Sequence, residues 1–401
     1  MTTARRTLIL TLPPHIPGGV AVQTRQLAVY LRSKGHEVTI AYYATPRLDP
    51  DLAIQLPHLF SGSQPAIRRE RCFGDFDGVA VGCRFPELEV SYTNDSSHWR
   101  ALIADHDRHL AVGGTVLASS PLAAANIPHL VWCASDVIGD RFNRRQAMSS
   151  LRRIYDHCVV TPLLRSAERR VLRGCGRLMA ISPFTEHRLR RLITASDRQI
   201  AQVPIPVDTA KFSPRPDELV PGRVGFVARL SDPRKNIPLL LRAVARLRRH
   251  IPGVELVLAG AGGTTLAQQI EALGLNTGVT FVGHLATDDL AALYRTFDVF
   301  AIPSHQEGLS IVGLEAMACG TPVVSTRCGG PEAFVTDDQT GFLVDFDEND
   351  LASAIARILQ DRGLRDRLAK NAHDYVEAHY SQKAFETAFT KEWQAAWQED
   401  P

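Results

Sequence analysis

The sequence predicts an α/β fold with two units, each built on a parallel sheet. Short apolar segments typical of buried strands alternate with helical patterns along both halves of the chain, which favours parallel α/β units over one antiparallel sheet. Residues 203–222 separate the halves and contain five prolines, so we expect a linker without regular structure there. A chain of 401 residues with 45% apolar content can bury two cores, since single domains seldom exceed about 250 to 300 residues.

The first half begins with a complete βαβ pattern. We expect a strand at residues 7–12, a loop at 13–19, a helix at 22–34 that ends at Gly35, and a strand at 38–43. Further strands of this half are expected at residues 79–83, 88–92, 117–119, 129–133 and 178–181.

The second half repeats the alternation of strands and helices. Its strands are expected at residues 224–228, 254–259, 279–282, 299–302, 323–326 and 342–344. Helical patterns lie between these strands, and three more follow at residues 348–360, 364–378 and 381–398.

Composition and charge exclude several classes of function. The chain carries 45 basic and 43 acidic side chains, so no overall field attracts nucleic acid, and we expect a small-molecule partner. The seven cysteines form no Cys-x-x-Cys pair and no ligand spacing with histidine, which argues against a zinc site and a disulfide framework and indicates a reducing cytoplasm. No apolar run reaches about 18 residues, and the run at residues 8–12 ends at two prolines, so we expect neither a membrane span nor a signal peptide.

The densest motif lies at residues 304–325, where a polar loop and a small-residue helix follow an apolar segment. Ser310 is placed to cap the helix, and a Gly-Thr-Pro turn ends it. We expect the backbone N–H groups of Gly308, Leu309 and Ser310, at the start of the helix, to face the carboxyl end of the strand, where they would bind a phosphate group.

Two carboxylates flank these donors, Glu307 in the loop and Glu315 in the helix, with seven residues between them. Together with the Gly-Thr-Pro-Val-Val turn, this pattern resembles the retaining nucleotide-sugar glycosyltransferases of family 4, which have the two-domain GT-B fold. The resemblance implies that Glu307 contacts the donor sugar and that Glu315 hydrogen-bonds the ribose hydroxyls. The alternative is that Glu307 is a solvated loop residue and Glu315 a surface charge of the helix.

A second constellation, residues 226–237, follows the first expected strand of the second half. Arg229 at the strand end and Lys235 at a helix start supply two positive charges near the proposed phosphate site. A leaving diphosphate gains negative charge, which Arg, Lys and backbone N–H groups must meet where no metal does so. The family places its Arg and Lys pair here, so the resemblance implies donor-binding and catalytic roles for Arg229 and Lys235, with Glu307 beside them. An ordinary basic loop is the alternative.

Gly18 and Gly19 lie between the first strand and the first helix, where glycine lets the backbone approach a phosphate or sugar closely. They resemble the family's N-terminal Gly-Gly loop, which faces donor and acceptor. A turn without a ligand is the alternative. The glycine-rich segment 260–263 lacks the third glycine of a dinucleotide fingerprint, because Thr265 stands there, and we interpret it as a structural turn near the nucleotide.

Asp49 and Asp51 have the Asp-x-Asp spacing with which metal-dependent glycosyltransferases of another fold hold a cation. The pair lies in a proline-bounded loop without a preceding strand end, so a chance match is the preferred interpretation. We therefore expect no metal and no other cofactor, and the nucleoside-diphosphate sugar is expected to serve as donor substrate.

An arginine-rich tract runs from Arg165 to Arg191. It is a candidate for peripheral contact with an anionic membrane, at its inner face, or with a lipid-linked acceptor. A solvated basic face is the alternative, because Glu168 and Glu186 interrupt the tract and no aromatic belt accompanies it.

The chain departs from the family at the apolar run 128–136. Many members have a histidine near the end of this run that reaches the donor sugar, and Ala134 or Ser135 stands there instead. His129 lies too early in the strand. Asp136 is the candidate contact to sugar or acceptor, and a helix N-cap is the alternative role.

These features predict an enzyme, a retaining hexosyltransferase that moves a sugar from a nucleoside-diphosphate sugar to an acceptor hydroxyl. The resemblance implies an acceptor-side domain at residues 1–205 and a donor-binding domain at 206–380, facing each other across a cleft. It also implies a last helix, at 381–401, that crosses back onto the first domain. The alternatives are a sugar-nucleotide epimerase of the same architecture and a non-catalytic nucleotide-sugar-binding subunit.

Overall fold

The computed structural model describes residues 5–16, 18–45, 49–54, 65–85, 89–93, 96–146, 148–174, 176–193, 199–215, 218–262 and 266–401. It divides the chain into two compact units. Unit 1 comprises Met1–Val203 and Thr387–Pro401, and unit 2 comprises Pro204–Glu386.

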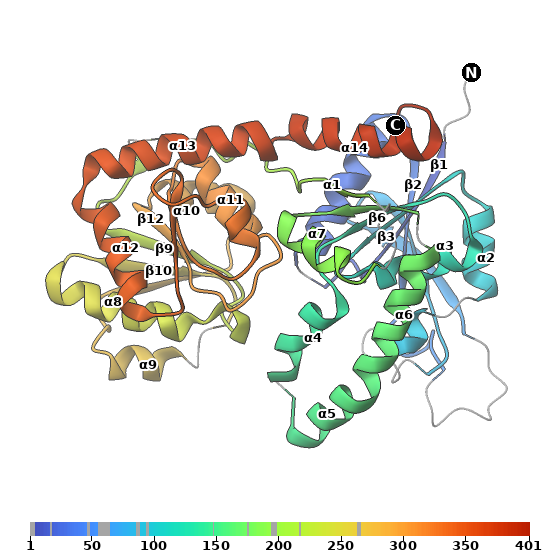
Figure 1. Cartoon of the computed structure of the whole chain (residues 1–401), viewed down its shortest axis with the longest axis horizontal. Helices are drawn as coiled ribbons and strands as arrows, with labels where there is room; N and C mark the ends of the chain where they lie inside the picture. Colours follow the sequence, from blue (N-terminus) through green and yellow to red (C-terminus); the bar gives the residue numbers. More distant parts are fainter. Residues whose placement is uncertain are drawn as a thin grey trace. The chain divides into compact units, whose positions relative to one another are not determined.

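Unit 1 is built on a mainly parallel sheet with helices on its faces (Figure 1). Among the described residues the strand order is β3-β4-β2-β1-β5-β6-β7-β8, and only β3 runs antiparallel to its neighbour. The strands are β1 Arg6–Thr11, β2 Glu37–Tyr43, β3 Ile67–Cys72, β4 Phe76–Val81, β5 Arg108–Gly113, β6 Leu130–Cys133, β7 Arg177–Ala180 and β8 Ile200–Gln202. The helices are α1 Gly19–Ser33, α2 Ser97–Ala104, α3 Ser120–Ala125, α4 Val137–Gln146, α5 Ser150–Tyr155, α6 Thr161–Gly174 and α7 Pro183–Arg190, with short turns η2 Glu89–Thr93, η3 Val116–Ser119 and η4 Asp156–Val160.

The last helix, α14 (Gln382–Trp397), packs its aromatic side chains against unit 1. The Phe389 ring meets Tyr30 of α1 edge to face at 5.7 Å, and the Trp393 ring meets His36 in the same way at 5.2 Å. Phe389 and Trp393 are fully buried. Burial of two large aromatic side chains contributes several kcal/mol to the free energy of folding. This contribution explains why residues so distant in sequence belong to unit 1.

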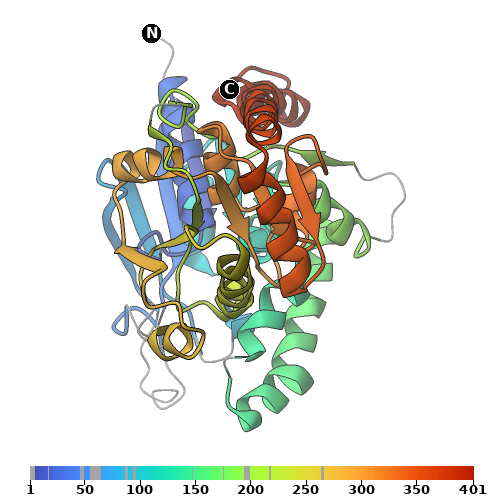
Figure 2. The same cartoon turned by 90° about the vertical axis from the view of Figure 1, so that its left-hand side faces the viewer.

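Unit 2 contains a parallel sheet with the order β11-β10-β9-β12-β13-β14 among the described residues (Figures 1 and 2). Its strands are β9 Arg223–Val227, β10 Glu255–Ala259, β11 Val279–Gly283, β12 Val299–Ile302, β13 Val323–Thr326 and β14 Gly341–Val344. Its helices are α8 Ile237–His250, α9 Ala267–Ala272, α10 Thr287–Arg295, α11 Ile311–Ala318, α12 Glu348–Gln360 and α13 Arg362–Tyr380, with short turns η6 Pro233–Lys235 and η8 Gly330–Ala333. The amphipathic helices α8 and α12 lie side by side and bury Leu240, Val244 and Ile355 in the core over the sheet.

The predicted α/β class with mainly parallel sheets is confirmed, and so are the six strand positions of the second half. Two predicted strands are wrong. Residues 89–93 of the expected strand 88–92 form the 3₁₀ turn η2, and Leu88 lies outside the described residues. The expected strand 117–119 is the 3₁₀ turn η3, because the Thr115 side chain accepts a hydrogen bond from the Leu117 N–H and caps a helical turn.

Candidate active site

The donor residues predicted in unit 2 follow two strands at the point where the strand order reverses. β9 and β12 are neighbours in the sheet, and the chain leaves them toward opposite edges, through β10 and β13. In open α/β sheets, ligands bind outside the carboxyl ends of the strands at such a point. Arg229 and Lys235 lie in the segment after β9, and Glu307 in the loop after β12.

Glu307 is held from both of these segments. Its Oε1 accepts hydrogen bonds from Lys235 Nζ at 2.6 Å and from Ser304 Oγ at 2.6 Å. Only 12% of the Glu307 side chain and 17% of the Lys235 side chain are exposed. Because it is largely buried, Glu307 is not a solvated loop residue. Burial also makes the ion pair with Lys235 stronger than a pair at the protein surface. The hydrogen bond from Ser304 to Glu307 could not be predicted from the sequence, in which only the position of Ser304 after the strand was visible.

The segment that carries Lys235 is fixed by its own hydrogen bonds. The Asp232 carboxylate accepts a bond from the Arg234 backbone N–H at 3.1 Å and so caps the turn η6. The Arg234 carbonyl accepts a bond from the His305 N–H at 2.7 Å, which ties the two segments together. Arg229 is placed differently from Lys235: its side chain is 53% exposed and reaches Asp232 at 3.4 Å. The structure therefore brings Lys235 to Glu307 and leaves Arg229 at the surface beside them.

The turn into α11 differs from the prediction in one respect. Ser310 occupies the N-cap position, as expected, but its side chain makes no capping hydrogen bond. Its backbone has φ +77° and ψ +76°, in the left-handed region, whereas side-chain capping needs the extended region. The Ser310 Oγ is buried and makes no hydrogen bond with the described residues. A buried hydroxyl without a partner costs free energy, so this turn keeps a polar atom available at the mouth of the helix.

A second glycine pair, Gly329 and Gly330, follows β13 and packs directly on this turn. The Gly329 N–H donates to Glu332 at 2.6 Å, and the Gly330 N–H donates to the Glu307 carbonyl at 2.8 Å. A Cβ at Gly330 would lie 2.4 Å from Leu309 Cα, so only glycine fits. This pair was not predicted from the sequence, although its place after a strand resembles that of Gly18 and Gly19.

Glu315 lies on α11 against a buried tyrosine of α10. The Tyr294 hydroxyl donates to Glu315 Oε2 at 3.0 Å. Burial raises the pKa of Glu315 to about 7, and the bond from Tyr294 opposes that rise. A helix surface charge does not fit this environment, because the carboxyl group is largely removed from solvent. The orienting role of Tyr294 was not visible in the sequence.

Gly18 and Gly19 lie at the carboxyl end of β1 in unit 1, where α1 begins. Both are exposed. A Cβ built on Gly18 meets no atom within 4 Å, so this backbone faces open space and is accessible to a ligand. The preceding Pro17 lies outside the described residues.

Asp136 follows β6 and is the N-cap of α4. Its Oδ1 accepts a bond from the Gly139 N–H at 3.2 Å and one from Arg188 Nε at 2.5 Å. The side chain is nearly inaccessible to solvent. These bonds satisfy the carboxylate within unit 1, which supports the N-cap alternative over a contact to sugar or acceptor.

Glu168 of α6 is a buried carboxyl group beside Asp136. Its Oε1 accepts a bond from the Val137 N–H at 2.8 Å, and its Oε2 has no partner among the described residues. Burial raises the pKa of Glu168 to about 7. Since this folded-state pKa lies above the unfolded value of about 4.3, the folded state holds the proton more tightly. Stability is therefore lost as the pH rises from about 4.3 through 7.

We expect Glu168→Gln to be more stable than the parent at pH 8, by up to about 3 kcal/mol, and similar to it at pH 5. Urea unfolding followed by tryptophan fluorescence measures this change in unit 1 alone, because Trp99, Trp132, Trp393 and Trp397 all lie there. Glu186→Gln is the control, since the Glu186 pKa is lowered despite burial by bonds from Arg190 and Gln202 and no gain at pH 8 is expected. Equal stability of parent and Glu168→Gln at both pH values would contradict the prediction.

The structure gives Asp49, the first residue of the Asp-x-Asp pair, a structural role, while Asp51 is exposed. Asp49 is buried and pairs with the Arg68 guanidinium of β3, and its Oδ2 lies 3.4 Å from the Thr45 N–H. Within the described residues, no group of three or more His, Cys, Asp or Glu side chains is placed to hold a metal ion. The glycine-rich segment after β10 is only partly described, because residues 263–265 lie outside the described ranges.

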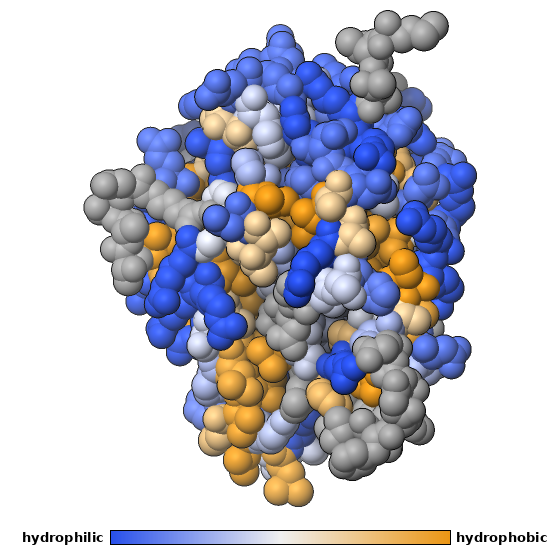
Figure 3. All heavy atoms as spheres, turned by 90° about the vertical axis from the view of Figure 1, so that its right-hand side faces the viewer, coloured by the Kyte–Doolittle hydropathy of each residue, from blue (hydrophilic) through white to orange (hydrophobic). Residues whose placement is uncertain are grey.

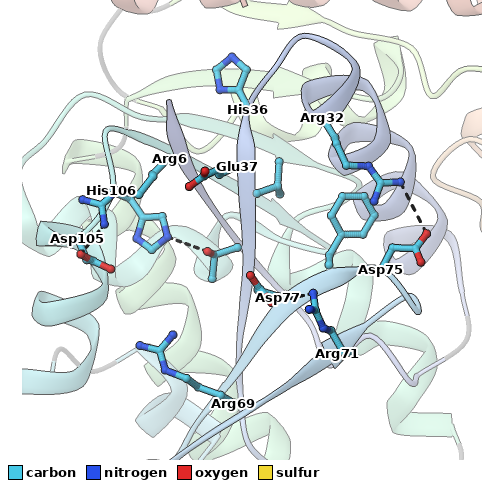
Figure 4. Close-up of a pocket in the computed structure, with 13 residues that line it drawn as sticks. Arg6, Arg32, His36, Glu37, Arg69, Arg71, Asp75, Asp77, Asp105 and His106 are labelled. Carbon is cyan, nitrogen blue, oxygen red and sulfur yellow. Dashed lines mark hydrogen bonds and ion pairs between the residues drawn. The ribbon is translucent and has the colours of Figure 1, made fainter. Parts of the chain in front are cut away.

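A separate pocket of about 300 Å³ lies at the amino-terminal edge of the unit 1 sheet (Figure 4). Arg6, Arg32 and Arg71 line it, and they pair with Asp105, Asp75 and Asp77 respectively. These paired charges balance one another, and the pocket is at the edge opposite Gly18. We therefore assign it no part in the active site.

The model of the family "Glycosyl transferases group 1" matches residues 216–375. The chain is 28% identical over 391 residues to a D-inositol 3-phosphate glycosyltransferase of Actinosynnema mirum, covering 88% of this chain and 87% of that protein. It is 31% identical over 302 residues to the GDP-mannose-dependent alpha-(1-6)-phosphatidylinositol monomannoside mannosyltransferase of Mycobacterium tuberculosis, covering 70% and 74%. It also has the fold of Anabaena HepE, solved in complex with UDP-glucose, with a TM-score of 0.71, 19% identity and coverage of 98% and 100%.

Fold and sequence together define a glycosyltransferase with the GT-B architecture. The chain belongs to the group 1 glycosyl transferases, and the resemblance to retaining family 4 enzymes is confirmed. It is an enzyme that transfers a sugar from a nucleotide-sugar donor to an acceptor. No helix in the described ranges combines the length and apolar character needed to cross a bilayer.

Proposed function

We propose that the donor binds in unit 2, at the segments that follow β9 and β12, with the Lys235–Glu307 pair at the centre of the site. The observation that carries this proposal is the pair itself, a 2.6 Å contact between side chains from the two strands that flank the switch point. A carboxylate accepts hydrogen bonds from sugar hydroxyls, and an ammonium group meets a diphosphate. Arg229 supplies a second cation, and the backbone of Gly308, Leu309 and Ser310 supplies N–H donors for the phosphate groups.

Transfer with retention then needs no enzymic nucleophile. The bond between the anomeric carbon and the diphosphate oxygen breaks while the bond to the acceptor oxygen forms on the same face of the sugar. The proton of the acceptor hydroxyl passes to the leaving phosphate oxygen. Lys235 and Arg229 meet the negative charge that grows on the diphosphate, which is where preorganised donors lower a barrier most.

Unit 1 is proposed as the acceptor side, with the exposed backbone at Gly18 and Gly19 as its contact to the reacting groups. The names of both relatives refer to a compound that contains inositol phosphate. We therefore propose a phosphorylated cyclitol as the acceptor class. A cytoplasmic setting with peripheral contact at the inner membrane face is also proposed, supported by the arginine-rich tract.

Donor and acceptor are tested in two steps. A thermal-shift panel of UDP-, GDP- and ADP-sugars identifies the base, since the donor that binds the native state raises its melting temperature. Release of nucleoside diphosphate is then measured with that donor, with and without inositol phosphates. Release that requires the acceptor is the expected result, and equal release without acceptor would contradict transfer.

Transfer is expected to survive chelation. The proposed site meets the diphosphate with Lys235, Arg229 and backbone N–H groups, so no cation is needed. The measurement is the rate of nucleoside diphosphate release in excess EDTA, with a magnesium-dependent glycosyltransferase as assay control. Complete loss of activity in EDTA, restored by magnesium or manganese, would reject the proposal.

A further inference from the structure

Helices α4, α5 and α6 form a helical lobe (residues 137–173) that projects from the sheet of unit 1 (Figure 1). Residues 150–174 are one continuous helical stretch, because α5, the π turn η4 and α6 follow each other without a break. The side chains on the inner face of this stretch have their partners within the lobe. Val160 and Leu164 pack against Val137, and the buried Asp156 carboxylate pairs with Arg141 and Arg145.

The outer face of the same stretch exposes a row of apolar side chains, and no contact among the described residues of unit 1 accounts for them. Helix α5 contributes no buried side chain, yet it carries Leu151 and Ile154, which are 83% and 62% exposed. Val159 and Leu163 continue the row along the helix and are 40% and 46% exposed. We call these four residues the apolar tip. Apolar side chains also gather at the lower end of the face shown in Figure 3. Contiguous exposed apolar groups of this kind mark an interaction surface more often than chance.

Three arginines extend the row beyond the apolar tip. Arg169, Arg170 and Arg173 of α6 are exposed, and none of them has an ion pair or side-chain hydrogen bond in the described part of the chain. We call them the arginine row. The later half of the arginine-rich tract is different, because Arg177, Arg188 and Arg190 pair with Glu392, Asp136 and Glu186. The structure thus places three uncompensated cations of the tract on the helical stretch that carries the apolar tip. Arg191, which is also exposed and has no ion pair among the described residues, lies outside the lobe.

We infer that the helical lobe docks on an anionic lipid bilayer, with the apolar tip in the interfacial region and the arginine row against lipid phosphates. An apolar face flanked by cationic side chains is the combination that holds a helix at the surface of an anionic membrane. This inference rests on the peripheral contact proposed above and names its surface and lipid chemistry. It does not depend on the donor site, because the lobe lies in unit 1 and the donor residues lie in unit 2.

The test uses the full chain and a fluorophore on Cys158. Cys158 is exposed beside the apolar tip, and the other described cysteines are buried. Cys175, outside the described residues, is replaced by serine in all variants. Vesicles of phosphatidylcholine alone are compared with vesicles containing roughly one third phosphatidylglycerol, in about 0.1 M salt. We expect a blue shift of the fluorophore and binding with the anionic vesicles, weakened at high salt.

Two sets of variants separate the apolar and charged contributions. Leu151→Ser with Ile154→Ser should weaken binding at least about tenfold, since each apolar side chain loses its burial in the interface. Arg169→Gln with Arg170→Gln and Arg173→Gln should weaken it on the order of a hundredfold, at about fivefold per arginine. The matched control is Arg190→Gln with Arg191→Gln, in the same tract but outside the lobe, which should bind like the parent.

Either of two results would overturn the inference. One is unchanged vesicle binding in the Leu151→Ser, Ile154→Ser variant. The other is self-association of the parent that this variant abolishes in light scattering, which would assign the surface to a second copy of the chain. Nucleoside diphosphate affinity, measured by calorimetry, should stay at the parent value in all lobe variants. A chain that binds vesicles but releases no nucleoside diphosphate would refute the proposed function and leave the docking surface standing.

Discussion

Lys235→Ala is expected to lower kcat about a hundredfold or more, with a smaller effect on the KM for the donor. Negative charge on the leaving diphosphate grows toward the transition state, so a donor aimed at it matters more there than in the ground state, and loss of one such donor has this magnitude. The contact with Glu307 at 2.6 Å adds to the effect, because the variant leaves a largely buried carboxylate whose remaining side-chain partner among the described residues is Ser304. Initial rates of nucleoside diphosphate release at varied donor concentration measure both constants.

The control for Lys235 is Arg242→Ala, which removes a cation from unit 2 at the surface of α8, where it pairs with Glu348. Its kcat should stay within about threefold of the parent, as for a typical exposed ion pair. If Lys235→Ala raises KM while kcat holds, Lys235 only binds the donor in the ground state. If both constants stay near the parent values, the role assigned to Lys235 is wrong.

The fold of unit 2 could be predicted closely because its strands are mostly apolar and are separated by clear helical patterns. A parallel strand buried on both faces reads as a continuous apolar run, as in Val299–Ile302, whose four residues are all buried. Unit 1 contains strands without this signal. β3 carries Arg68, Arg69, Glu70 and Arg71 and lies at the sheet edge, so it was missed. β5 begins with Arg108 and His109, and His109 is tolerated there because its ring bonds to the Ile103 carbonyl.

The order of charged groups along the candidate site could also be predicted, but their contacts could not. Glu307 and Lys235 are 72 residues apart, and only the adjacency of β9 and β12 brings them together. The conformation of Ser310 and the close approach of Gly330 are set by packing between two loops. The local conformational propensity of a serine or a glycine does not predict such a contact between loops. Asp136 had two interpretations in the sequence, a ligand contact and a helix N-cap, and its hydrogen bond from the Gly139 N–H fits the N-cap role.

Glu315→Ala is expected to weaken nucleoside diphosphate binding at least about tenfold, because each hydrogen bond from a ribose hydroxyl to a carboxylate contributes about 1.5 to 3 kcal/mol. The structure adds a dependence on pH. Burial raises the pKa of Glu315 to about 7, so near pH 6 most of the unliganded protein holds a protonated carboxyl group. Only the ionised group accepts on all its lone pairs. The affinity should therefore rise about tenfold between pH 6 and pH 8, as the proton that opposes binding is lost.

Calorimetric titration of parent and Glu315→Gln with the same nucleoside diphosphate isolates this dependence, because ionisation of the phosphate is common to both and cancels in their difference. The parent should gain affinity relative to Glu315→Gln as the pH rises. Tyr294→Phe provides a second check. The Tyr294 hydroxyl donates to Glu315 Oε2 at 3.0 Å and holds the carboxyl pKa down, so its loss should move the midpoint of the dependence to higher pH. A Glu315→Ala affinity within threefold of the parent, or a parent-to-Gln difference that is constant with pH, would remove Glu315 from the ribose site.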